Sequence, residues 1–303
     1  MQLSEKSGMI NGVAEHVPCR FFMIGGIEMS FTVRLATYED MAECVRVEKE
    51  TMGNYCYLED AWHYFYNQDG GLVCVFEDDH MVGIGRFSVL FDGTGWLETL
   101  RVSPKWQNHG AGKAIYREYR KLAEKNGCPS MAMFTGVTNQ VSAGLAKFNG
   151  LSKAGQHRGY HLTDLSGGNP HGFRHVNWQR AVELIVPKKE EYNDYMIFNR
   201  TFYHVNEANA KGFAMEGKVF EDQESGSFIV CGARFQHQVT VHIAMMGGDY
   251  DKCIDFAVNY AKAQGIPKVS CTYCIENEKL EQTLIRRGFA AESGDLITME
   301  IKF

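Results

Sequence analysis

The chain has 303 residues, of which 45% are apolar and 22% charged. This composition suffices for a full core and excludes wholesale disorder. A net charge of −6 argues against a dedicated nucleic-acid binder, because that function needs concentrated positive charge. No apolar run approaches the ~20 residues of a membrane-spanning helix, and the short apolar stretch 21–27 is a poor secretion signal. We therefore expect a soluble, cytoplasmic protein whose partners include neither nucleic acid nor membrane.

The nine cysteines do not form a metal-binding pattern. Cys271 and Cys274 have C-x-x-C spacing, but they lie in a segment with the pattern of a β-strand, and no second pair completes a zinc set. The four histidines between residues 157 and 175 lie in an expected β segment and in a breaker-rich loop, so we do not expect two of them on one helix face. We expect ordinary half-buried thiols, a solvated loop around the histidines and no metal site.

The first half of the chain alternates strands and helices. Thr37 is placed to cap a helical region that runs, with breaks, to about residue 68. A later helix has apolar residues at spacings of three and four and ends at Asn126-Gly127. The expected strands cover residues 31–35, 72–77, 81–91, 96–102, 131–135 and 156–162, and the later helices cover residues 110–125 and 139–148.

The second half repeats this order of elements without repeating the sequence. The expected strands cover residues 213–220, 228–235, 238–245, 271–275 and 296–303, and the expected helices cover residues 249–263 and 277–287. A segment rich in glycine, proline and asparagine separates the halves. We therefore predict an α/β (α+β) fold of two domains, 29–165 and 177–303, joined by a linker over 166–176. Residues 1–28 are interpreted as a dispensable extension, with Met29 as the expected start of the folded part.

The most informative stretch runs from Leu97 to Lys113. It leads from an apolar strand through a proline-containing bend into a helix start that Gly110 and Gly112 keep free of bulk. Unpaired N–H groups and the positive end of the helix dipole favour a phosphate or pyrophosphate at such a place. Residues 101–125 carry seven basic and two acidic side chains, a local charge of +5. A polyanionic cofactor would be attracted there, although a solvated basic helix face is the alternative.

The segment Gln107-Asn108-His109-Gly110-Ala111-Gly112 resembles the [QR]-x-x-G-x-[GA] signature of the GCN5-related N-acetyltransferase (GNAT) superfamily. The upstream V-x-P at 102–104 and the opening R-x-A-T-x-x-D at 34–40 also resemble that family, over roughly residues 31–163. The resemblance implies acyl-CoA N-acyltransferase-like domains, each with a mixed, mostly antiparallel central sheet flanked by helices. It also implies acetyl-CoA as co-substrate and direct transfer of an acyl group to a primary amine of a small molecule or peptide, without a metal.

The resemblance further implies how the cofactor would be held. A strand backbone pairs with the pantetheine arm, loop amides hold the pyrophosphate, and an asparagine after the next strand lies beside the cofactor. That asparagine is equally well explained as a helix cap. The implied cofactor-binding residues are Leu100, Arg101, Val102, Gln107, Asn108, His109, Gly110, Ala111, Gly112, Lys113, Asn139 and Ser142.

Two further positions bear on catalysis. Glu98 lies where several family members keep an acidic general base, although a solvent-exposed strand carboxylate is the alternative. The family pattern N-x-x-A-x-x-L-Y places Ala146 where a tyrosine commonly protonates the leaving thiolate. This departure leaves water, Ser142 or no proton donor at all as possibilities.

The second half resembles the later family pattern over residues 277–289, with Leu284 in place of the tyrosine, but its phosphate loop is missing. Asp249 and Asp251 stand where phosphate would bind, and we expect no basic cluster to offset them. The second domain is therefore expected to be degenerate and to shape the acceptor pocket. The aromatic residues between 55 and 66 line that pocket or pack between helices.

Three functions remain open on the sequence alone. The first is a monomeric or homodimeric N-acetyltransferase, and the second is a non-catalytic acyl-CoA sensor, suggested by Ala146. The third is an enzyme that binds a nucleotide phosphate at the same helix start. Fold alone does not choose among them.

Overall fold

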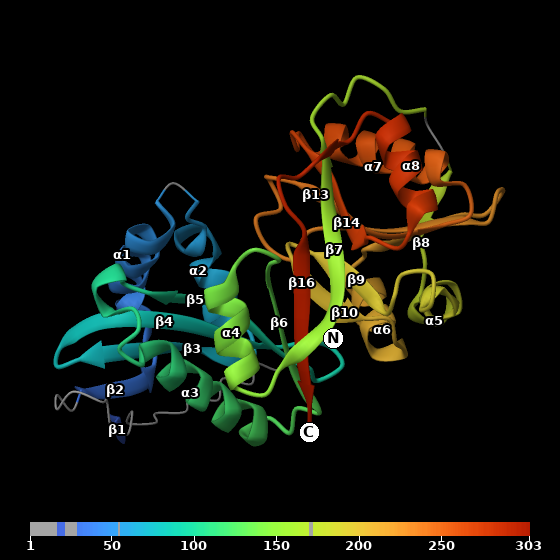
Figure 1. The fold of residues 1–303 in the computed structure, drawn as a ribbon. Helices are drawn as coiled ribbons and strands as arrows, with labels where there is room; N and C mark the ends of the chain where they lie inside the picture. Colours follow the sequence, from blue (N-terminus) through green and yellow to red (C-terminus); the bar gives the residue numbers. More distant parts are fainter. Residues whose placement is uncertain (1–16, 22–28, 54, 170–171) are drawn as a thin grey trace, which may run out of the picture.

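A computed structural model of the protein describes residues 17–21, 29–53, 55–169 and 172–303 (Figure 1). Fourteen of their strands join into one sheet in the order β1-β2-β3-β4-β5-β6-β16-β7-β14-β13-β12-β11-β8, with β15 beside β7, and β9 and β10 form a separate antiparallel pair. Only β5–β6 and β13–β14 pair in parallel. The expected fold class, a mixed and mostly antiparallel sheet flanked by helices, is confirmed. Within the described ranges, no helix has both the length and the apolar character needed to cross a bilayer.

The first half contains most of the elements expected from its sequence. They are β2 (Met29–Leu35), α1 (Met41–Met52), α2 (Leu58–Asn67), β3 (Gly70–Glu77), β4 (His80–Val89), β5 (Gly95–Val102), α3 (Ala111–Lys125), β6 (Ser130–Gly136), α4 (Gln140–Phe148) and β7 (Ser152–Leu162). β1 (Val17–Phe21) was not expected, and it pairs antiparallel with β2 at the edge of the sheet. The rest of the extension 1–28 lies outside the described residues.

The second half differs more from expectation. Its elements are β8 (Phe173–His175), α5 (Trp178–Ile185), β9 (Tyr195–Phe198), β10 (Thr201–His204), α6 (Glu207–Met215), β11 (Val219–Asp222), β12 (Ser227–Gly232), β13 (Val241–Gly247), α7 (Tyr250–Ala263), β14 (Val269–Cys274), α8 (Glu278–Arg286), β15 (Ala290–Ala291) and β16 (Leu296–Lys302). The expected strand over 213–220 is wrong in its first part, because α6 extends to Met215. The side chain of Asn206 caps α6, and Ala210 and Phe213 are buried at helical spacing.

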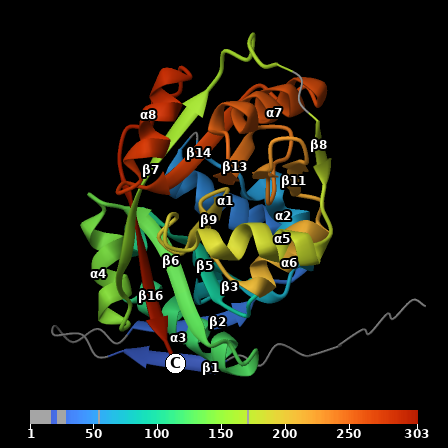
Figure 2. The same ribbon diagram turned by 90° about the vertical axis from the view of Figure 1, so that its right-hand side faces the viewer.

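The two halves share strands at their junction. β16, the last strand of the chain, lies between β6 and β7 and is antiparallel to both (Figures 1 and 2). β7 pairs with β16 over Ser152–His157 and with β14 over His157–Leu162. The second half therefore completes the sheet of the first, and strand pairing crosses the sequence boundary expected at 166–176.

A half-buried histidine of β10 ties β16 to the rest of the second half. The Nδ1 atom of His204 lies 3.1 Å from an Asp194 carboxylate oxygen, and its Nε2 atom lies 3.3 Å from Oε1 of Glu300 on β16. Burial by itself disfavours the imidazolium, but the contacts with Asp194 and Glu300 outweigh it and raise the pKa of His204 from 6.5 to about 9. The charged histidine therefore stabilises the fold at neutral pH.

This contact predicts a loss of stability on the alkaline side. Stabilisation is fully present below the unfolded-state pKa of 6.5 and is lost as the pH rises through the folded-state pKa of about 9. The shift corresponds to on the order of 3 kcal/mol. Melting temperatures measured across this window should fall for the natural chain and stay flatter for His204→Gln. An identical alkaline slope in the two proteins would contradict the assignment. The buried His157 and the half-buried His242 titrate in a more acidic range, because desolvation lowers their pKa values to about 4 and about 3.

Candidate active site

The start of α3 is built to receive an anion. Gly110, its N-cap residue, has a φ of 98°, and the preceding Asn108 has a φ of 64°. No side chain in the described part of the chain caps this helix, so the N–H groups of its first turn have no partner from a cap. Gln107 ties the loop to the end of β5 through a hydrogen bond from Nε2 to the Val102 carbonyl, 3.1 Å long. The expected phosphate loop therefore has the conformation that anion binding requires.

The neighbouring strand β5 has an open backbone edge. Its parallel pairing with β6 runs from Gly95 to Leu97, and beyond that point the described pairing of β5 is with β4 alone. Thr99 has a φ of 57°, a left-handed conformation that is costly for a β-branched residue. Leu100, Arg101 and Val102 follow this irregularity. The side chains of Arg101 and Gln107 donate to the carbonyls of Leu100 and Val102, over 3.0 and 3.1 Å. No described strand pairs with the edge of these residues toward β6, which is the kind of edge that an extended ligand with amide groups joins.

The later part of α4 packs against the start of α3. A Cβ atom added at Gly112 would lie 2.9 Å from Cδ2 of Leu145 on α4. The Lys113 ammonium on α3 lies 4.2 Å from the ring centroid of Phe148, the last residue of α4. The loop 107–113 and α4, whose first turn holds Ser142 and whose cap is Asn139, therefore lie on the same side of the sheet (Figure 1).

Asn139 does cap α4, since its Oδ1 accepts a 3.1 Å hydrogen bond from the Ser142 backbone N–H. The capping interpretation is therefore confirmed, and contact with a cofactor stays a prediction. Ala146, which stands in place of the family tyrosine, is fully buried. It packs in the hydrophobic core of the first half.

Glu98 lies in a buried ion pair with the second half. Arg234 donates to both carboxylate oxygens, over 2.8 and 2.9 Å, and Ser88 donates a 2.6 Å hydrogen bond to Oε1. Glu98 is only 9% exposed, so the alternative of a solvated strand carboxylate is wrong. Its role as general base stays a prediction. Arg234 is a residue that sequence reasoning missed, because nothing local to 228–235 signals a partner 136 positions away.

The aromatic residues of α2 and the segment before it pack around a residue of the second half. Phe235 lies with its ring centroid 5.7 Å from Tyr57, 5.9 Å from Tyr64 and 5.2 Å from Phe65. These side chains therefore make an interdomain contact rather than an empty acceptor pocket. The Tyr57 hydroxyl also lies 2.9 Å from Oγ1 of Thr99, which places a phenol at the irregularity in β5.

The equivalent strand edge in the second half is filled by its own chain. The β13–β14 ladder runs from Val241 to Ile243 as the β5–β6 ladder runs from Gly95 to Leu97, so Met246 corresponds to Leu100. The hydroxyl of Tyr192 donates to the Met246 carbonyl over 2.9 Å and accepts from the Met246 N–H over 2.8 Å. Tyr192 is buried and occupies the backbone groups that a ligand would need.

The start of α7 is likewise closed to anions. Asp249 caps it, and its carboxylate accepts from the N–H groups of Asp251 and Lys252. The expectation that no basic side chains offset these acids is wrong, because Arg286 and Arg287 of α8 both pair with Asp251. These arginines neutralise Asp251, while the Asp249 carboxylate still takes the anion's place.

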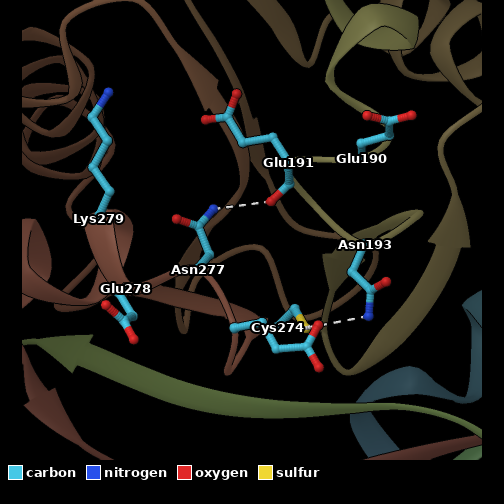
Figure 3. A pocket seen from close by; sticks show the side chains of 8 residues that line it. Glu190, Glu191, Asn193, Cys274, Asn277, Glu278 and Lys279 are labelled. Atoms are coloured by element: carbon cyan, nitrogen blue, oxygen red, sulfur yellow. Dashed lines mark hydrogen bonds between the residues drawn. The ribbon is translucent and has the colours of Figure 1, made fainter.

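The pocket at the end of β14 is acidic (Figure 3). It has a volume of about 420 Å³ and is lined by Glu190, Glu191, Asn193, Cys274, Glu276, Asn277, Glu278 and Lys279. The side chain of Asn277 donates to the Glu191 carbonyl, 3.1 Å away, and that of Asn193 points to the Cys274 sulfur, 3.3 Å away. Four carboxylates against one ammonium would repel a polyphosphate, so this pocket does not repeat the site of the first half.

Comparison with known proteins agrees with this geometry. Residues 35–151 match the family model described as the Acetyltransferase (GNAT) family. A GCN5-related N-acetyltransferase from Sphaerobacter thermophilus is similar with 12% identity and a TM-score of 0.62, covering 90% of this chain and 95% of that one. A tandem GNAT protein from the clavulanic acid biosynthesis pathway has 12% identity and a TM-score of 0.58, covering 90% and 98%. No curated protein sequence matches the chain.

The first half of the chain therefore contains a domain that matches the GNAT acetyltransferase family over residues 35–151, as its motifs indicated. The two solved structures, at identities this low, add the fold: the whole chain has the architecture found in a tandem GNAT protein.

Proposed function

We propose that the protein is an acetyl-CoA-dependent N-acyltransferase whose single active site lies in the first half. The observation that carries this proposal is the contrast between the halves. The uncapped, glycine-lined start of α3 adjoins an open edge of β5, whereas Asp249 and Tyr192 close the equivalent places in the second half. Acceptors are expected to be primary amines of small molecules or peptides.

The residues present fit a CoA molecule. The N–H groups around Gly110 to Lys113 would hold the pyrophosphate, and the basic side chains of α3 would add attraction. The backbone of Leu100 to Val102 would pair with the pantetheine arm, which carries amide groups. Asn139 and Ser142, at the start of α4, would border the arm near its thioester.

Acyl transfer needs an acceptor for the amine proton and a source of a proton for the departing thiolate. Glu98, directly or through water, is the proposed proton acceptor. Because the alanine side chain at 146 has no ionisable group, the proton for the thiolate must come from elsewhere. The Tyr57 hydroxyl, held at Thr99, is a candidate donor that the sequence did not suggest, beside Ser142 and water.

Glu98→Gln is expected to lower the turnover number by about 10²–10⁴-fold, the usual effect of losing a general base. Affinity for CoA should change much less, because the phosphate loop lies on α3. Steady-state kinetics combined with calorimetric binding would measure both quantities. If Glu98→Gln had the turnover number of the natural protein over the whole accessible pH range, Glu98 would not be the general base.

The proposed function is tested by incubating the full chain with acetyl-CoA labelled in the acetyl group and a panel of amines. Transfer of label to an amine, together with release of free CoA, is the expected result. Saturable binding without transfer to any amine would favour an acyl-CoA sensor. Displacement of CoA by ATP at comparable concentration would favour a nucleotide-phosphate enzyme.

A further inference from the structure

The guanidinium of Arg234 joins the two halves at Glu98, two residues before the open edge of β5 begins at Leu100. Besides its two hydrogen bonds to Glu98, it donates to Oγ1 of Thr201 over 2.8 Å and to the Tyr64 hydroxyl over 3.2 Å. The Arg234 backbone N–H donates to Oδ1 of Asn199 over 2.7 Å. The side chain of Arg234 is 5% exposed, so its position is fixed by partners from both halves.

The ion pair extends into a longer polar network. Arg86, itself buried, donates from Nε to the Ser88 hydroxyl over 3.1 Å, and Ser88 donates to Glu98. Glu98 thus lies between a buried cation of each half. A buried ion pair is weak evidence for stability, because apolar side chains of similar volume often stabilise as well or better. We therefore consider how this ion pair constrains the backbone of β5 rather than how much it stabilises the fold.

That geometry concerns the residue after Glu98. Thr99 has the left-handed φ of 57°, and the unpaired edge from Leu100 onward begins there. Strained backbone persists only where its surroundings hold it in place. Arg234 fixes the Glu98 side chain on one side of this irregularity, and the Tyr57 hydroxyl contacts Thr99 itself.

We propose that Arg234 is a positioning residue for acyl transfer: through Glu98 it holds the irregular segment of β5, so that the second half supplies part of the active site. This inference rests on the proposed function, and it gives the second half a catalytic purpose without a cofactor of its own.

Arg234→Met should lower the turnover number by about tenfold or more, since small displacements of reacting groups are costly. CoA affinity should fall much less than turnover, because the pyrophosphate loop 107–113 keeps its conformation and only the pairing of residues 100–102 with the pantetheine arm is loosened. Arg234→Lys should restore part of the rate by supplying the charge without the two-pronged geometry. The matched control is Arg200→Met, which removes an exposed ion pair with Glu292 in the same half and should leave the rate unchanged.

Hydrogen exchange separates this inference from the proposed function. Amides of residues 98–102 should exchange faster in Arg234→Met, whereas those of 107–113 should keep the natural rate. If that variant does not fold, Thr201→Val removes one partner of Arg234 while keeping the ion pair, and it should show the same pattern more weakly.

Natural turnover and natural exchange in the folded variants would overturn the positioning role. A loss of CoA affinity as large as the loss of turnover would also overturn it, because it would indicate general disruption of the first half. Absence of acyl transfer by the natural chain would instead refute the proposed function, and the exchange data would still decide whether Arg234 orders β5.

Discussion

Gly112→Asp should abolish CoA binding without destabilising the protein. Gly112 lies in the first turn of α3, where a carboxylate would take the N–H groups for itself and repel a pyrophosphate. The second half already has an acid at the equivalent position, since Asp251 is the second residue of α7 and follows the Asp249 cap. An acid in the first turn commonly stabilises a helix by ~0.3–1 kcal/mol. The melting temperature should therefore be unchanged or higher, while calorimetry with CoA shows no heat of binding.

Gly112→Ala is the matched control. Its Cβ would meet only the end of the flexible Leu145 side chain, and alanine satisfies the [GA] position of the motif. Gly110 is less suitable, because its φ of 98° would strain any other residue. Retained CoA binding in Gly112→Asp would show that the phosphate site lies elsewhere.

Removal of residues 296–303 should abolish CoA binding and cooperative folding together, although β16 lies far along the chain from the phosphate loop. Its alternating side chains serve both halves: Leu296 packs in the core of the second half, and Ile297 and Met299 pack in the core of the first. Its loss would also leave β6 and β7 with unpaired edges in the middle of the sheet. Circular dichroism during heating would measure the expected loss of a sharp transition.

Removal of Phe303 alone is the control, because this residue follows β16 and is 60% exposed. That variant should melt cooperatively and bind CoA. If the shorter chain ending at Asp295 folded cooperatively and bound CoA, the first half would not need β16 for folding or for CoA binding.

Local features were predictable from the sequence because their causes are local. The glycines at the start of α3 and the apolar spacing along it predicted both the helix and its open end. The expected strand over 213–220 was wrong because its apolar residues fit a strand as well as a helix, and the Asn206 cap determines the outcome. Short apolar runs carry this ambiguity in general.

Features that join distant residues were not predictable in this way. The pattern of 296–303 predicts a strand, but no periodicity specifies that it pairs with β6 and β7 rather than within its own half. Arg234 and Tyr192 likewise gain their roles from partners far along the chain, Glu98 and Met246. The residues that would contact the acceptor amine could not be predicted for the same reason, since they depend on how the two halves pack together.

Calorimetric titration of the full chain with acetyl-CoA tests the central claim most directly. The open start of α3 and the free edge of β5 predict saturable binding of one molecule per chain, since Asp249 and Tyr192 close the second half. Binding of two equivalent molecules would show that the second half is not closed. Absence of binding would contradict the assignment of the first half as an acyl-CoA site.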